Sequence, residues 1–173
     1  MKARVSILVL ILSMIVTSGF SQDKTRREKK EERKMEKQKE IEAMINAKEF
    51  VFVPQTVLPS RMKPVNISTN GNYIKFQPDY IDSYMPFFGR AYSGVGYGAD
   101  AGLSFNGTPE KFTLDKKGKT FQINVVVRGG SNTFRLFLSV GFEGNTSLSI
   151  SSNNRETSSY QGEISALERM GNK

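Results

Sequence analysis

The sequence predicts an all-β fold with an N-terminal charged helix: an antiparallel meander of about eight strands, curled into a partly open barrel or a sandwich. The first observation behind this prediction is that apolar and polar residues alternate from Phe50 onward, which is the period of half-buried strands. The second is that glycines separate these runs at spacings typical of short hairpin loops. The third is that residues 23–40 favour a helix and contain neither Gly nor Pro.

Residues 1–21 have the features of a secretory signal peptide. Lys2 and Arg4 precede an apolar run over residues 5–16, and the small and polar residues that lead to Ser21 suit cleavage after it. The run is shorter than the roughly 20 apolar residues of a spanning helix, so no transmembrane span is expected after cleavage. The chain has no Cys, so a lipid-modified N-terminal Cys is excluded. We expect an exported protein, periplasmic or extracellular, that is not a lipoprotein.

Residues 22–47 form the predicted charged helical segment. Its first turns are charged, and apolar residues mark one face only near its end, at Ile41, Met44 and Ile45. This pattern favours a solvated helix whose last two turns dock against an opening or an edge of the sheet. The alternative is a segment that binds a partner or lies on a membrane surface.

The net charge of the chain does not point to nucleic acid. The chain has 25 basic and 17 acidic residues, but residues 41–173 carry only 14 and 11 of them. Nucleic-acid binding normally needs a basic stripe on the folded domain. We therefore predict no nucleic-acid partner.

Residues 48–165 form the predicted β domain, followed by a C-terminal tail over residues 166–173. Its strands are expected at residues 50–53, where Pro54 ends the strand, near 65–69, at 73–77, around 103–105 and 112–114, and at 121–128, 134–140, 148–150 and 160–164.

Three predicted hairpins place apolar residues opposite one another, as stable cross-strand pairs require. A two-residue loop at Lys117-Gly118 would pair Leu114 with Phe121 and Phe112 with Ile123. A loop at Gly130-Ser131 would pair Val127 with Phe134, Val125 with Leu136, Ile123 with Leu138 and Phe121 with Val140. A three-residue loop over residues 142–144 would pair Leu138 with Leu148 and Leu136 with Ile150. A slip of one residue would turn each of these side chains to the wrong face.

The composition excludes several kinds of site. Without His or Cys there is no Ser-His-Asp or Cys-His nucleophile, no disulfide and no structural zinc site of the usual ligands. We predict no metal site, no cofactor and no assignable catalytic residue.

Residues 80–97 are the candidate functional segment, because they combine aromatic side chains with closely spaced glycines. Tyr has an apolar face and a polar tip, which suits exposed stacking and interfaces. In the functional interpretation the segment is an aromatic lip that binds a glycan, a peptide or a partner protein. In the alternative it is a connection that folds Phe87 and Phe88 into the core. The candidate binding residues are Tyr80, Tyr84, Arg90, Tyr92 and Tyr97.

Several motifs resemble one family of exported proteins from Bacteroidota, which is grouped as domain of unknown function 4251. They are Phe50-Val-Phe52 followed by Pro59, Tyr84-Met-Pro-Phe-Phe-Gly-Arg-Ala-Tyr92, Gly102-Leu-Ser-Phe105, and Leu148-Ser-Ile-Ser-Ser-Asn-Asn-Arg155 with Gly162. The resemblance covers about residues 40–165. It implies an envelope or secreted protein with no established activity and no catalytic residues to carry over.

Three functional hypotheses remain open at this point. The first is a non-enzymatic exported domain that binds an envelope protein, a peptide or a glycan through residues 80–97. The second is a hydrolase that acts on glycans with carboxylates and Tyr, for which Asp79, Asp82 and Asp100 are candidates. The third is a structural envelope component that docks through its charged helix.

Overall fold

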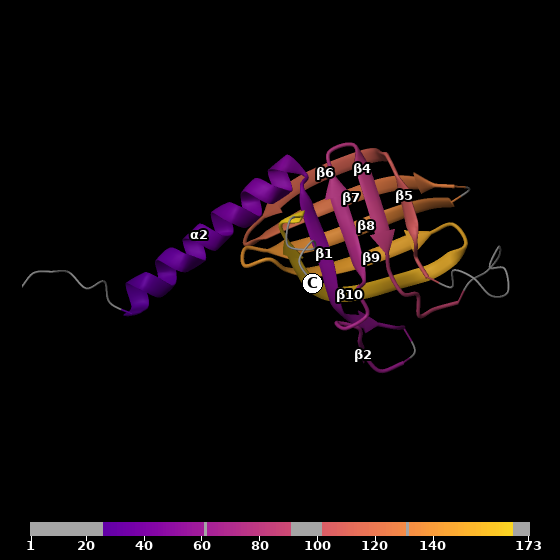
Figure 1. Cartoon of the computed structure of the whole chain (residues 1–173), viewed down its shortest axis with the longest axis horizontal. Coiled ribbons are helices and arrows are strands. Elements are labelled where there is room, and N and C mark those ends of the chain that lie inside the picture. The colour runs from indigo at the N-terminus through magenta and orange to yellow at the C-terminus, as the bar shows by residue number, and fades with distance from the viewer. Residues whose placement is uncertain (1–25, 61, 91–101, 131, 168–173) are drawn as a thin grey trace, which may run out of the picture. The chain divides into compact units, whose positions relative to one another are not determined.

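The computed structural model describes residues 26–60, 62–90, 102–130 and 132–167 of the chain. The chain divides into two compact units, residues 1–34 and residues 35–173. In the first unit, residues 26–34 are helical; the second unit contains the rest of this helix and all the strands (Figure 1). The elements are α2 (Arg26–Ala47), β1 (Phe50–Leu58), β2 (Val65–Asn66), β3 (Tyr73–Gln77), β4 (Tyr80–Tyr84), β5 (Phe105–Gly107), β6 (Pro109–Lys117), β7 (Thr120–Gly129), β8 (Asn132–Gly141), β9 (Asn145–Ser152) and β10 (Arg155–Ser165).

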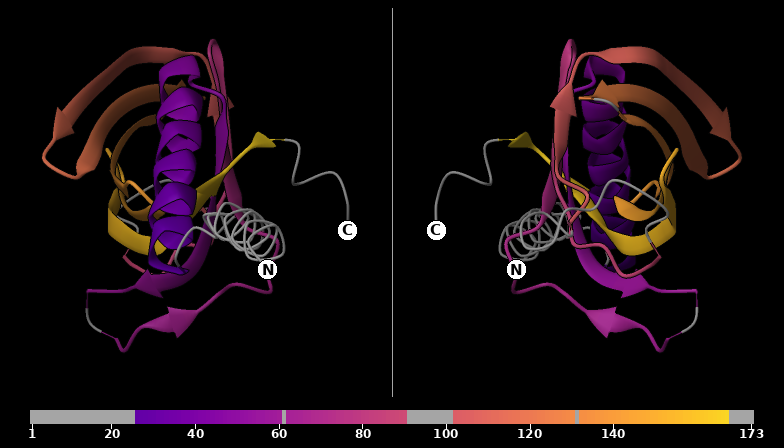
Figure 2. Two further views of the ribbon diagram at one scale, coloured as in Figure 1. Left: turned by 90° about the vertical axis from the view of Figure 1, so that its left-hand side faces the viewer. Right: turned by 90° about the vertical axis from the view of Figure 1, so that its right-hand side faces the viewer.

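The strands form one antiparallel sheet in the order β5-β4-β3-β1-β10-β9-β8-β7-β6, with β2 paired to β1. Its two edge strands, β5 and β6, follow one another in the chain but do not pair with each other. The sheet curls round so that these edges border one seam (Figure 2). Close to the seam, the ring of Phe105 in β5 stacks on Phe134 in β8, with ring centroids 4.1 Å apart. The predicted all-β meander is confirmed, and its closure is that of a nearly closed barrel.

Two of the three predicted hairpins have the predicted register. Val125 faces Leu136 in the β7–β8 pair, and Leu138 faces Leu148 in the β8–β9 pair. Gly130 and Gly144 have φ values of 60° and 94°, in the region where glycine is cheapest. The predicted loop residue Ser131 itself lies outside the described residues.

The β6–β7 hairpin differs from the prediction by two residues. Its loop is Gly118-Lys119, so Leu114 faces Ile123 and Phe112 faces Val125. Gly118 has a φ of 59° and is the first loop residue, which is the glycine position of a type II′ turn; the predicted loop placed it second. A shift of two residues preserves the inward face, so the predicted side chains still point into the barrel.

Pro54 does not end the first strand, contrary to the prediction. Strand β1 continues to Leu58, with an irregular register around Pro54. On its other side β1 pairs with β3 at residues 50–52 and with β2 at residues 56–57, so Pro54 lies between the two partners. A missing backbone N–H is tolerated at such a bulge.

The barrel interior is one apolar cluster that includes the end of the helix. Ile41 and Ile45 of α2 are buried in it together with inward side chains of the sheet, as the apolar face at the end of the segment predicts. The helix ends at Ala47, and the next residue, Lys48, has a φ of 57°. The N–H groups of Lys48 and Glu49 donate to the carbonyls of Ile45 and Met44. This Schellman-type end turns the chain directly into β1.

Candidate functional site

The candidate site lies on the outer face of β3, β4 and β5. Ile74 and Phe76 of β3 point into the core, so Tyr73 and Lys75 point outward by the alternation of a strand. The register places Tyr84 beside Tyr73 and Asp82 beside Lys75. On the next strand Asn106 pairs with Asp82. The three short strands therefore bring aromatic, acidic and amide side chains together on one surface.

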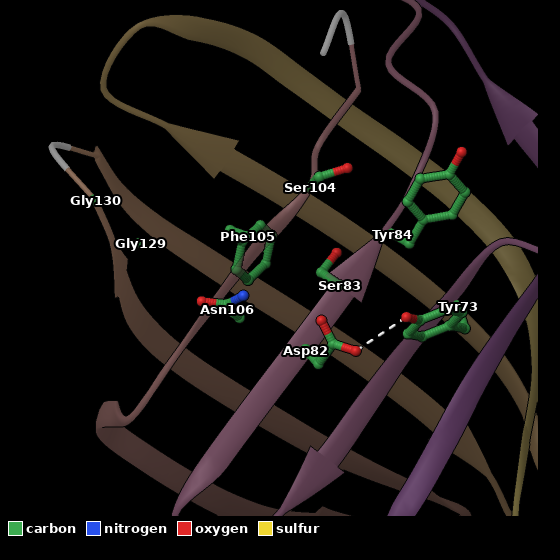
Figure 3. A pocket seen from close by; sticks show the side chains of 9 residues that line it. All are labelled: Tyr73, Asp82, Ser83, Tyr84, Ser104, Phe105, Asn106, Gly129 and Gly130. Carbon is green, nitrogen blue, oxygen red and sulfur yellow. Dashed lines mark hydrogen bonds between the residues drawn. The ribbon is translucent and has the colours of Figure 1, made fainter. Parts of the chain in front are cut away.

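These side chains line a hollow of about 440 Å³. The Tyr73 hydroxyl donates a hydrogen bond to Asp82 Oδ2 at 3.0 Å, drawn as a dashed line in Figure 3. The Tyr73 and Tyr84 rings are tilted by 35° with centroids 6.3 Å apart, and Lys75 Nζ lies 4.6 Å from the centre of the Tyr73 ring. The lining residues are Tyr73, Asp82, Ser83, Tyr84, Ser104, Phe105, Asn106, Gly129 and Gly130.

Burial, and after it the hydrogen bond to the carboxylate of Asp82, raises the pKa of the Tyr73 hydroxyl above its usual value. Tyr73 therefore keeps its proton and acts as a donor at any physiological pH. The hydrogen bond to Tyr73 holds Asp82 Oδ2, and no hydrogen bond from a described residue is present at Asp82 Oδ1. The site thus offers one oriented carboxylate oxygen beside an aromatic face; the Tyr84 side chain is 55% exposed.

Bonds between distant residues hold the strands beside the hollow. The Ser83 hydroxyl donates to the carbonyl of Leu103 at 3.0 Å, and the Leu103 N–H donates to the carbonyl of Met85 at 2.7 Å. Gly129 lies so close to β5 that an added Cβ would lie 2.9 Å from Phe105 Cβ. These contacts fix β5 against both β4 and the end of β7.

A second hollow, of about 430 Å³, adjoins the first, since Tyr84 and Ser104 line both. Here the backbone of residues 85–87 is anchored from inside the barrel by Tyr160, whose hydroxyl donates to the carbonyl of Pro86 at 2.6 Å. Burial raises the pKa of Tyr160 to about 12. The Arg155 guanidinium also donates to the carbonyl of Gly102, which lines this hollow too.

The structure places the predicted binding residues apart. Tyr84 lines the hollow, whereas Tyr80 is exposed on the same face of β4, beyond Asp82, and does not line it. Arg90 lines another hollow, of about 360 Å³, where its backbone exchanges hydrogen bonds with Glu156. Tyr92 and Tyr97 lie outside the described residues.

The expected lip begins as a strand, because Tyr80–Tyr84 is β4. Its inward side chains are Ile81 and the polar Ser83, so the apolar alternation that signals a strand is weak here. Phe87 and Phe88 pack against the core, as the alternative interpretation of a connection predicts.

Of the carboxylates predicted for glycan hydrolysis, the two that the structure describes, Asp79 and Asp82, are not brought together in this hollow. Asp82 is the one acidic residue that lines it; Asp79 lies in the turn between β3 and β4, and Asp100 is outside the described residues. Glycosidases of the usual kind need two carboxyl groups flanking one bond. Within the described ranges, no group of three acidic residues is placed to hold a metal ion, and no helix is long and apolar enough to cross a membrane.

Tyr73, Ser104 and Asn106 were not predicted as site residues. Tyr73 carried a usable signal, since it alternates with Ile74 and Phe76 and so had to face outward. Ser104 and Asn106 alternate in the same way with Leu103 and Phe105 and so face outward, but only the pairing of β5 with β4 brings them to the hollow.

Comparison with known proteins identifies a family. No curated protein sequence matches the chain. The structure resembles the crystal structure of a DUF4251 family protein from Bacteroides eggerthii DSM 20697, with a TM-score of 0.61 and 17% sequence identity over 77% of this chain and 89% of that one. At this identity the likeness concerns the fold alone. The sequence profile of the domain of unknown function DUF4251 matches residues 32–164, and the chain therefore belongs to the DUF4251 family.

Proposed function

We propose that the chain is an exported, non-enzymatic binding domain that holds a neutral glycan in the hollow formed by Tyr73, Asp82 and Tyr84. The observation that carries this proposal is the Tyr73–Asp82 hydrogen bond of 3.0 Å beside the exposed ring of Tyr84. An aromatic face can pack against the C–H face of a sugar ring, while an oriented carboxylate oxygen and the Asn106 amide can bind its hydroxyl groups. Among the described residues Asp82 has no ion-pair partner, so its negative charge disfavours an acidic ligand.

Binding is tested with the purified protein on an array of neutral and acidic oligosaccharides, followed by titration calorimetry with the best neutral one. We expect Tyr84→Ala and Asp82→Asn each to weaken binding by about tenfold, the loss of roughly 1.4 kcal/mol that one good contact contributes. Tyr80→Ala is the matched control, because Tyr80 is exposed on the same strand but outside the hollow. Equal binding by Tyr84→Ala and the unchanged protein would refute the proposal.

Export is proposed on the basis of residues 1–21, whose basic start, apolar run and small polar end suit a signal peptide. The test is to express the full chain and a chain that lacks residues 2–21 in a bacterial host and to fractionate the cells. We expect only the full chain to be processed and recovered outside the cytoplasm. Equal retention of both in the cytoplasm would contradict export.

A further inference from the structure

A second hollow, of about 410 Å³, lies on the outer face of strands β6–β10 and shares no residue with the Tyr73–Asp82 hollow. Two cross-strand rows build it. One row aligns Thr113, Asn124, Phe137 and Ser149, and the other aligns Lys111, Val126, Arg135 and Ser151. All of these side chains belong to the outward set, because their sequence neighbours Ile123, Val125, Leu136, Leu138 and Ile150 fill the barrel core.

The three middle strands of this face have no free backbone hydrogen-bonding groups for a ligand. Strands β7, β8 and β9 each pair with a neighbour on both sides, so their N–H and C=O groups are used in the sheet. A peptide that binds by adding a strand needs an open edge; β6, the edge strand among those that line the hollow, is unpaired only on its side away from β7 and from the rest of the hollow. Recognition must therefore come from side chains alone, and these are mostly hydroxyl and amide groups around one aromatic ring.

That ring belongs to Phe137, which is 41% exposed on the central strand β8. Its ring offers an accessible apolar face against which a ligand can pack. It is surrounded by Thr113, Asn124 and Ser149, which can donate and accept hydrogen bonds. A sugar ring suits this arrangement, because it has an apolar C–H face and a rim of hydroxyl groups.

The charge of the hollow selects among sugars. Lys111 and Arg135 are its two charged lining residues, both basic, and no Asp or Glu lines it. In the part of the chain that the structure describes, neither makes an ion pair, whereas nearby Arg128 pairs with Glu110 at 3.1 Å. Two cations beside a hydroxyl-rich surface complement an anion, and the Arg fork matches a carboxylate in particular.

We propose that this hollow binds an acidic oligosaccharide whose sugar rings carry carboxylate groups. Phe137 packs against a ring, Arg135 and Lys111 bind carboxylates, and the hydroxyls of Thr113 and Ser149 bind sugar hydroxyls. This site does not depend on the Tyr73–Asp82 hollow, and it takes a ligand of opposite charge preference.

The test is calorimetric titration of the purified protein with tetragalacturonic acid at low salt. The methyl ester of the same tetrasaccharide has the same rings without the charges, and tetraglutamate has the charges without the rings. We expect the acid to bind at least about tenfold more tightly than either, because an exposed charge contributes little without the stacking contact. Equal binding of the methyl ester would overturn the charge argument, equal or tighter binding of tetraglutamate would assign the surface to an acidic peptide, and no binding of the acid would overturn the site.

Variants locate the binding. Arg135→Gln and Phe137→Ala are each expected to weaken binding of the acid about fivefold, a typical share for one charged or aromatic contact at an exposed site. Arg128→Gln is the matched control, since it removes the same charge from the outer face of the neighbouring strand but lies outside the hollow. Tyr84→Ala should leave binding of the acid unchanged. The test of this hollow is therefore independent of whether the Tyr73–Asp82 hollow binds a neutral glycan. Losses with Arg128→Gln as large as with Arg135→Gln would mean non-specific attraction and would overturn the site; melting temperatures confirm that each variant is folded.

Discussion

Strands β6–β10 and strands β1–β5 are held together in different ways. Each of β6–β10 is joined to the next by a loop of two or three residues, so its neighbour in the sheet is also its neighbour in the chain. Strands β3 and β4 also form a local hairpin. Strand β1, in contrast, pairs with β10 from the far end of the sequence, and β5 pairs with β4 although about 20 residues separate them in the chain. Strands β6–β10, the local half, are thus built from successive hairpins, although the β6–β7 and β9–β10 pairs each contain a register shift. The other half contains the Tyr73–Asp82 hollow. Only the side of this hollow formed by β5 and Gly129 depends on contacts between residues that are far apart in the sequence.

The largest expected effect is at the joint between the two halves, where β10 meets β1. Gly162 faces Pro54, and a Cβ added to it would overlap the carbonyl oxygen of Val53 and lie 2.8 Å from Pro54 Cα. Because backbone must move to make room, we expect Gly162→Ala to lower the free energy of unfolding by more than about 3 kcal/mol. Urea unfolding followed by circular dichroism measures this loss.

Gly118→Ala is the control within the local half. Gly118 has open space around it and a φ of 59°, so an added methyl group strains only its own backbone. The expected loss is about 1 kcal/mol. Equal losses for the two variants would contradict the view that the joint between the halves is the more sensitive place.

The next effect is expected at the end of helix α2, which packs into the barrel core beside the local half. Ile45 is completely buried, and its neighbour on the same helix face, Ile41, lies against the loop between β8 and β9 at Gly144. We expect Ile45→Ala to cost about 3 kcal/mol, from lost burial and the cavity left behind. Met35→Ala, at a helix position that is 59% exposed, should cost less than about 0.5 kcal/mol. A small loss for Ile45→Ala in thermal unfolding would show that the helix end is dispensable for the fold.

A smaller effect is expected where Tyr160 ties the two halves together from inside. Tyr160→Phe leaves the carbonyl of Pro86 without its donor, which should cost about 1–2 kcal/mol. Native-state hydrogen exchange should show faster exchange at Met85 and Leu103, beside the second hollow, than in β7 and β8. Uniform acceleration over the whole sheet would instead mean that Tyr160 supports both halves equally.

The same residue predicts a dependence on alkaline pH. Burial raises the pKa of Tyr160 to about 12, above its value of 10 in the unfolded chain. The stabilisation is fully present below pH 10, and it is lost as the pH rises toward 12, because the unfolded chain releases the proton first. The loss for a two-unit difference is about 2–3 kcal/mol, and Tyr160→Phe should remove this part of the pH profile. Parallel profiles for both proteins between pH 10 and 12 would contradict this assignment.

The difference between the halves also explains how much of the molecule could be predicted. The register of β7, β8 and β9 could be predicted because apolar alternation and loop glycines agree over neighbouring segments. The continuation of β1 through Pro54 could not, since it depends on which strands flank that residue and on Gly162 opposite it. Local patterns carry no information about a partner so far away in the sequence.

Individual residues of the candidate site could be predicted from the sequence, but their grouping could not. Tyr84 was predicted from its aromatic surroundings, but its grouping with Tyr73 and Asp82 depends on the pairing of β3 with β4. Strand β4 itself was missed because buried Ser83 replaces the apolar residue that a strand pattern needs; its hydroxyl is satisfied by the carbonyl of Leu103. A buried polar residue such as Ser83 thus breaks the apolar alternation from which a strand is predicted.

The smallest effect is expected at the surface of the local half, where Lys116 Nζ lies 2.9 Å from Glu42 Oε1. Both groups are exposed, so Glu42→Gln should cost no more than about 0.5 kcal/mol, and the loss should vanish in roughly 1 M salt. Lys116→Gln should cost more, up to about 1 kcal/mol, because the same ammonium group lies 5.3 and 5.5 Å from the ring centres of Phe121 and Phe142. That additional part should persist in salt, since it arises close to the protein surface between one cation and two rings. Urea unfolding of both variants at low and high salt measures the two contributions. A loss for Glu42→Gln as large as that for Ile45→Ala would show that charge, and not the buried apolar face, holds the helix end against the local half.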